Sequence, residues 1–123
     1  MKAVRESPAS GALEAEEIEA IIAGSCTEVS EVFAAERDPA RIREFFSCLF
    51  TPSEVREFSL RWALVNEMLA GKTQREIARR YGMSLCKITR GSRELKRENS
   101  PFRRMIEMHN ELQKRRTGKN GKN

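Results

Sequence analysis

The fold is decided by the stretch from Gly71 to Lys96, GKTQREIARRYGMSLCKITRGSRELK, which has the pattern of two short helices joined by a tight turn. Thr73 followed by Glu76 forms a capping box, in which the hydroxyl and the carboxylate each satisfy a backbone N–H at a helix start. Gly82 suits the end of that helix because glycine adopts positive φ at low cost. Ser84 is expected to cap the second helix.

This predicted helix-turn-helix, over about residues 73–96, carries a concentration of positive charge. Residues 71–97 hold nine Lys or Arg side chains and two Glu, a net charge of +7. A second helix of this width and charge fits the major groove of B-DNA. An ordinary helical hairpin that packs without binding DNA remains the simpler alternative, and the charge argues against it. The side chains expected on the inner faces are apolar: Ile77, Ala78, Tyr81, Met83 and Ile88.

The sequence before this stretch predicts four more helices. The first is expected over 13–23 and is ended by Gly24, and the second over about 27–36. A third short helix begins at Pro39, with Asp38 as its cap. A second capping box, Thr51 to Glu54, starts the longest helix, which should end at Ala70. That helix is apolar on more than one side and is therefore expected to be buried on more than one side, at the centre of a dimer. Its apolar positions are Val55, Phe58, Leu60, Trp62, Leu64, Val65, Met68 and Leu69.

Charge is divided unevenly along the chain. Residues 1–50 contain five basic and ten acidic side chains, whereas residues 51–123 contain eighteen basic and eight acidic ones. A basic half suits a polyanion such as double-stranded DNA and makes its binding salt-dependent. We expect one helical domain over 13–113, ending in an amphipathic helix, between a flexible N-terminal arm (1–12) and a disordered basic tail (114–123).

Other functional classes find little support in the sequence. No apolar run approaches the length of a membrane span and no signal peptide is evident, so we expect a cytoplasmic protein with no membrane partner. Cys26, Cys48 and Cys86 show no C-x-x-C spacing and the chain has one histidine, His109, so no metal site is predicted. A nucleophilic pair of Cys86 and His109 stays open, but no orienting acid or oxyanion motif accompanies it. The expectation is a protein that is not an enzyme.

The segment TPSEVREFSLRWALVNEMLAGKTQREIARRYGMSLCKITRGSRELK resembles the bacterial tryptophan repressor family. The shared features are the TPSE entry, a central arginine, QRE and above all ITRGS, and they cover about residues 45–96. The resemblance implies an all-α, intertwined helical homodimer with a helix-turn-helix as its DNA-reading part. It also implies a transcriptional repressor that binds operator DNA when L-tryptophan, its corepressor, is bound, and that regulates genes of tryptophan biosynthesis or transport.

The resemblance assigns a ligand pocket to particular residues. Arg61 and Arg90 match the two arginines that sandwich the indole ring, a role that suits guanidinium planes because they stack on aromatic faces. Arg90 also matches a partner of the ligand carboxylate. The remaining assignments are Thr51 near that carboxylate, Gly91 at the pocket wall, and the carbonyl groups of Cys48 and Phe50 toward the ammonium. Glu94 stands where the family usually has serine, so either the ammonium meets a carboxylate or the pocket prefers another ligand.

The resemblance also assigns DNA contacts. Leu85, Cys86 and Thr89 match positions that face base edges, whereas Gln74, Arg75 and Lys96 match contacts nearer the phosphates. Lys87 is expected to lie outward beside Cys86 and to contact DNA as well.

Two departures from the family pattern keep alternatives open. The loop 71–73 is one residue shorter than usual, and Ala78 replaces a lysine that reaches DNA. The first alternative is a tryptophan-independent, repressor-like DNA-binding regulator. The second is a helical interaction module without sequence-specific DNA binding.

Overall fold

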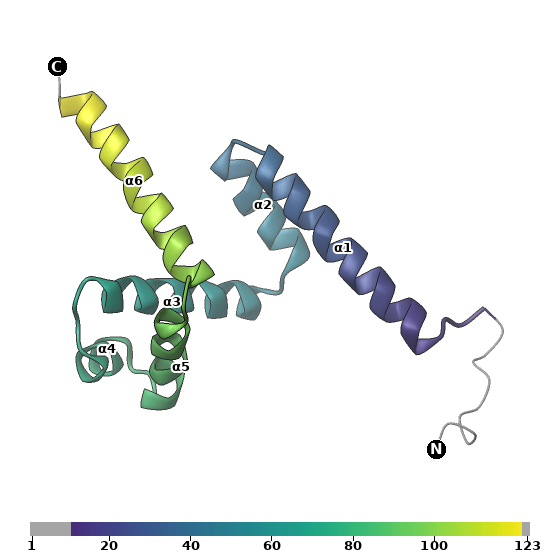
Figure 1. Ribbon diagram of the computed structural model, residues 1–123, viewed down its shortest axis with the longest axis horizontal. Helices are drawn as coiled ribbons and strands as arrows, with labels where there is room; N and C mark the ends of the chain where they lie inside the picture. Colours follow the sequence, from purple (N-terminus) through teal and green to yellow (C-terminus); the bar gives the residue numbers. More distant parts are fainter. Residues whose placement is uncertain (1–10, 122–123) are drawn as a thin grey trace. The chain divides into compact units, whose positions relative to one another are not determined.

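The computed structural model describes residues 11–121, with side chains described through residue 118, and over this range it contains six helices and no strand (Figure 1). The chain divides after Leu49 into two compact units. The prediction of an all-α fold is confirmed. Most of the expected N-terminal arm lies outside the described residues.

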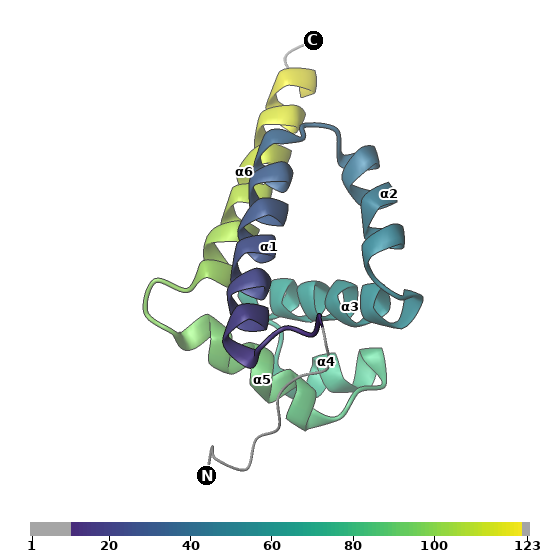
Figure 2. The same cartoon turned by 90° about the vertical axis from the view of Figure 1, so that its right-hand side faces the viewer.

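The first unit consists of α1 (Ala15–Ala35) and α2 (Pro39–Leu49), which run antiparallel (Figure 2). Phe33 of α1 contacts the rings of Phe45 and Phe46 edge-on, at centroid separations of 6.0 and 5.7 Å. The Ala40 N–H donates to Asp38 Oδ1 at 3.0 Å, which confirms the predicted cap. Over residues 15–49, all of which the structure describes, no side chain is buried.

One prediction for this unit is wrong. The sequence predicts two helices separated at Gly24, but α1 is continuous through that residue. The hydroxyl groups of Thr27 and Ser30 donate to the carbonyl groups of Ala23 and Cys26, four residues earlier, at 3.1 and 2.8 Å. Both hydroxyls therefore bond back to the preceding turn of the existing helix instead of capping a new one. A glycine within an exposed helix costs only about 1 kcal/mol, which the long helix tolerates.

The second unit begins at Phe50 and contains α3 (Pro52–Leu69), α4 (Gln74–Tyr81), α5 (Leu85–Lys96) and α6 (Pro101–Gly121). With 18 residues α3 is shorter than α1 and α6, which have 21 each, so the prediction that it is the longest helix is wrong. In both views α4 and α5 lie on one side of α3, and α6 leaves from the other side (Figures 1 and 2). The core joins all four helices, and each fully buried aliphatic side chain in it contributes roughly 1.5–3 kcal/mol. Its members are Leu64, Val65, Ile77, Ile88, Leu95 and Ile106.

Local signals explain where these helices begin and end. The Thr51 and Thr73 hydroxyls each accept the N–H of the glutamate three residues later at 3.1 Å, so both predicted capping boxes are present. Gly82 ends α4 at φ +63°, as predicted. Ser84 precedes α5 at the expected position, but its side chain forms no capping hydrogen bond. The α6 helix continues to Gly121 and so overlaps most of the segment 114–123, for which composition predicts disorder.

Candidate functional site

The predicted helix-turn-helix is formed by α4 and α5. Ile77 of α4 and Ile88 of α5 are fully buried, and Ala78, Tyr81 and Met83 pack against the core that contains them. The inner-face prediction is therefore confirmed for all five positions. Packing of this kind fixes α5 relative to α4 and leaves the outer surface of α5 free for contacts.

The start of α4 is held by the capping box. The Thr73 N–H and hydroxyl both donate to Glu76 Oε1, at 3.1 and 3.2 Å. These hydrogen bonds lower the pKa of the Glu76 carboxyl from its ordinary value, and the backbone hydrogen bond has the larger effect. The carboxylate thus carries a negative charge at the helix N-terminus, where the helix dipole favours it.

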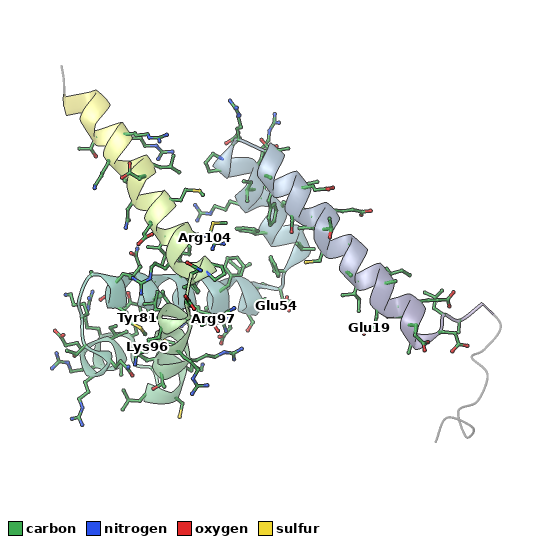
Figure 3. The ribbon with its side chains drawn as sticks, viewed as in Figure 1. Glu19, Glu54, Tyr81, Lys96, Arg97 and Arg104 are labelled. Atoms are coloured by element: carbon green, nitrogen blue, oxygen red, sulfur yellow. The ribbon has the colours of Figure 1, made fainter. Side chains whose placement is uncertain are left out.

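A second cluster joins α4 to α3. Glu67 of α3 accepts hydrogen bonds from Arg80, at 2.6 Å, and from the Tyr81 hydroxyl. The hydrogen bond to Glu67 is the main cause that raises the pKa of Tyr81, and burial is the next largest cause. Tyr81 lies where α4 faces α3 (Figure 3). Sequence reasoning missed this cluster because its members are thirteen and fourteen residues apart.

The predicted DNA contacts lie on the outer surface of α4 and α5. Thr89 donates a hydrogen bond to the Gln74 side-chain oxygen at 3.2 Å, so these two predicted contacts lie side by side. Leu85 is 49% exposed at the first residue of α5, and Lys96 ends that helix (Figure 3). The structure exposes every residue of the predicted set except Gln74, which is half-buried: Arg75, Leu85, Cys86, Lys87, Thr89 and Lys96.

A hollow of about 170 Å³ lies between α3 and α5, and both predicted indole-stacking arginines line it. We call it the α3–α5 hollow. Pockets for small ligands typically measure about 300–1,000 Å³, so the hollow is smaller than a typical ligand pocket. Its lining residues are Glu57, Arg61, Leu64, Met83, Lys87 and Arg90.

Gly91 allows α5 to approach α3 closely. A Cβ atom at this position would lie 2.8 Å from Leu64 Cδ1, which is too close, and 3.0 Å from Val65 Cγ2, which is tight. Gly91 is itself buried. Gly91 thus lies where α5 crosses α3, next in sequence to Arg90, which lines the hollow together with Arg61.

The other predicted ligand residues are more dispersed. Thr51 Oγ1 is engaged in the cap of α3, and Phe50 stacks edge-on against Phe58 at 5.2 Å. Glu94 accepts a hydrogen bond from Arg97 at 2.8 Å and does not line the α3–α5 hollow. Cys48 belongs to α2, in the first unit.

Two charged lining residues were not predicted as ligand contacts. Lys87 Nζ lies 3.7 Å from Glu57 Oε2, so an ion pair connects α5 to α3 at the hollow. The sequence did contain a signal for Glu57, because it stands four residues before Arg61 on the same helix and thus on the same face. Lys87, which was predicted to contact DNA and not the ligand, also lines the hollow.

Within residues 11–121, no group of His, Cys, Asp or Glu side chains is arranged to hold a metal ion. Cys26, Cys48 and Cys86 are free and exposed. No helix in this described range is long and apolar enough to cross a membrane.

Comparison with known proteins agrees with the geometry of α3 to α5. The Trp repressor protein family matches residues 25–110, more than half of the chain. The chain belongs to the Trp repressor family. It is therefore a transcriptional regulator of a DNA-binding, non-enzymatic family, which confirms the predictions of family and of a protein that is not an enzyme.

Individual relatives show the extent of this similarity. The chain is 35% identical over 77 residues to a Trp operon repressor homolog of Chlamydia caviae, covering 62% of this chain and 76% of that protein. A homolog from Chlamydia trachomatis serovar D is 36% identical over 67 residues, or 54% and 71% of the two chains. One from Vibrio parahaemolyticus is 33% identical over 70 residues, or 56% and 68%. No solved structure matches the chain significantly.

Proposed function

We propose that the protein is a tryptophan-responsive repressor that binds operator DNA as a homodimer and regulates genes of tryptophan biosynthesis or transport. The observation that carries this proposal is that Arg61 and Arg90, on two different helices, line one hollow. Two guanidinium groups in one small hollow suit a flat aromatic ligand that also bears a carboxylate.

The place of the hollow provides the mechanism. Arg61 belongs to α3, whereas Arg90 belongs to α5, whose outer surface carries the proposed DNA contacts. A ligand held between them fixes the orientation of α5 relative to α3. Dimeric helix-turn-helix proteins place their two recognition helices about 34–36 Å apart, which lets them enter successive major grooves, and tryptophan repressors are among these proteins. The ligand shifts DNA affinity only by its preference for that arrangement, typically by about 1–3 kcal/mol.

Dimerisation is supported by the exposed apolar side chains of the first unit. Ile21 and Ile22 of α1 are 52% and 55% exposed, and Leu49 of α2 is 44% exposed. Apolar surface gathered on helices without any buried residue is typical of an interface between chains. A second subunit would cover this apolar surface.

The proposal is tested by titrating the protein calorimetrically with L-tryptophan and by measuring affinity for a duplex selected from a random-sequence library. We expect one site per subunit and DNA binding at least fivefold tighter with ligand. Arg90→Ala should abolish the ligand response while dimerisation persists. Arg93→Ala, which removes the same charge from α5 outside the hollow, is the matched control and should retain the response.

A tryptophan-independent regulator is the second candidate, since Glu94 is bound to Arg97 and the loop before Gln74 is short. It predicts equal DNA affinity with and without ligand, and no calorimetric signal at millimolar L-tryptophan. A helical interaction module would instead show weak DNA binding with a shallow dependence on salt.

A further inference from the structure

The α3–α5 hollow already contains an ammonium group bound to a carboxylate. Lys87 Nζ lies 3.7 Å from Glu57 Oε2, and both side chains remain more than half exposed, at 59% and 55%. Exposed ion pairs contribute little to stability, so this pair is easily exchanged for another. Glu57 also lies one helical turn from Arg61, on the face of α3 that lines the hollow.

We propose that the Glu57 carboxylate binds the ammonium group of a zwitterionic amino-acid effector, and that this ammonium displaces Lys87. The inference rests on the proposed function, because the effector is the one held between Arg61 and Arg90. It makes Glu57 a specificity-determining residue that distinguishes an α-amino acid from the same molecule without its amino group.

The charges of the hollow support this assignment. Three cations, Arg61, Lys87 and Arg90, line it, and Glu57 is the one acid among the described lining residues. An effector carboxylate is therefore attracted to the arginines, while its ammonium has a single oppositely charged partner. The exchange replaces one ammonium by another on the same carboxylate, so Glu57 stays paired throughout.

Glu94 is a weaker candidate for the same role. Its carboxylate accepts a hydrogen bond from Arg97 at 2.8 Å, and it lies outside the lining of the hollow. An effector reaching Glu94 would have to break that shorter contact. The longer Glu57 pair, at 3.7 Å, is the one positioned beside the arginines.

The displacement has a consequence for DNA binding. Lys87 lies in the first turn of α5, beside the exposed Leu85 and Cys86. Once released from Glu57, its ammonium is available to a DNA phosphate. Each phosphate neutralised by a cation steepens the salt dependence of binding by about one unit of log K against log salt. The effector would thus add a DNA contact as well as fix the orientation of α5.

Two isosteric variants test the proposal, with L-tryptophan and indole-3-propionate, which lacks the ammonium, as calorimetric probes. Glu57→Gln should weaken L-tryptophan binding roughly two- to fivefold and leave indole-3-propionate unchanged. Lys87→Gln removes the internal competitor and should tighten L-tryptophan binding by a similar factor. Glu107→Gln, an exposed charge change on α6, is the control and should alter neither ligand.

The signs of these effects decide the outcome. If the ion pair merely joins two helices, both variants change L-tryptophan affinity in the same direction, which overturns the proposal. If Lys87 instead holds the effector carboxylate, Lys87→Gln weakens both ligands and overturns it as well. When both ligands bind the unaltered protein but Glu57→Gln affects neither, the inference fails and the tryptophan site stands. When neither ligand binds, the proposed function fails with it.

Discussion

The two units of this chain differ in how they use their apolar residues. In the unit from Phe50 onward, α3 to α6 enclose every buried apolar side chain of the described residues, from Leu64 to Ile106. In the unit that ends at Leu49, α1 and α2 bury none, although their apolar side chains are as regularly spaced. Regular spacing therefore predicts that a helix has an apolar face, but not what covers that face.

The difference also separates two kinds of function. The second unit carries its own core and contains both the hollow and α5, so it can hold the residues of these two features in place by itself. The first unit offers exposed Ile18, Ile21 and Ile22 and an acidic surface. Such a surface is suited to another protein chain and not to DNA.

The largest predicted effect comes from shortening one core side chain. Ile88→Ala should lower the free energy of unfolding by about 2–5 kcal/mol, because Ile88 is fully buried and its removal leaves a cavity. Val32→Ala, in the first unit, is the comparison, since Val32 is 56% exposed. In denaturant titrations of dilute protein it should change stability by less than about 0.5 kcal/mol.

Protein concentration sharpens this first comparison. If a second subunit covers α1, the cost of Val32→Ala should grow as the protein concentration rises, whereas that of Ile88→Ala should not. A large, concentration-independent cost for Val32→Ala would show that the first unit packs within its own chain.

A smaller effect is expected from adding one methyl group at either of two helical glycines. Gly91→Ala should destabilise the second unit by about 1–3 kcal/mol, because the new Cβ would meet Leu64 and Val65. Gly24→Ala meets nothing within 4 Å and should instead stabilise α1, by up to about 1 kcal/mol. Thermal unfolding of both variants measures the two signs. Destabilisation by both would mean that α1 also crosses another helix closely at Gly24.

The same contrast explains which features could be predicted from the sequence. Both capping boxes, the turn at Gly82 and the inner positions Ile77 and Ile88 depend on residues within a few positions of one another. Local signals of this kind fix helix boundaries in either unit. The prediction failed at Gly24 and Thr27, residue types that often end and begin helices, because both lie within the continuous helix α1.

Contacts between charged side chains of different helices were predictable only where a family pattern supplied them. Arg61 and Arg90 were predicted together from that pattern, and the structure places them on one hollow. Glu57 and Lys87, thirty residues apart, needed the crossing angle of α3 and α5, which no local pattern specifies. The role of Gly91 at that crossing was likewise invisible to spacing alone.

A third comparison concerns two threonine hydroxyls. Thr73→Ala removes the cap of α4 and should cost about 1 kcal/mol. Thr27→Ala, within α1, removes a hydroxyl that bonds back to the carbonyl four residues earlier, a bond that slightly destabilises a helix, and alanine is the better helix former. We expect it to be neutral or slightly stabilising in the same chemical denaturation experiment. Equal losses at the two positions would contradict the view that Thr73 acts as a helix start.

The smallest effect is a pH dependence at the same helix start. The Thr73 hydrogen bonds lower the pKa of Glu76 in the folded protein. The ionised Glu76 carboxylate therefore contributes its full stabilisation above the ordinary glutamate pKa of about 4.3, and this stabilisation is lost as the pH falls through the lower pKa of the folded protein. Glu76→Gln keeps a side-chain acceptor for the Thr73 N–H but does not titrate. The unaltered protein should therefore exceed the variant in stability at pH 7, and the difference should shrink between pH 5 and about pH 3. A difference that is constant over this range would mean that the carboxylate charge contributes nothing to the start of α4.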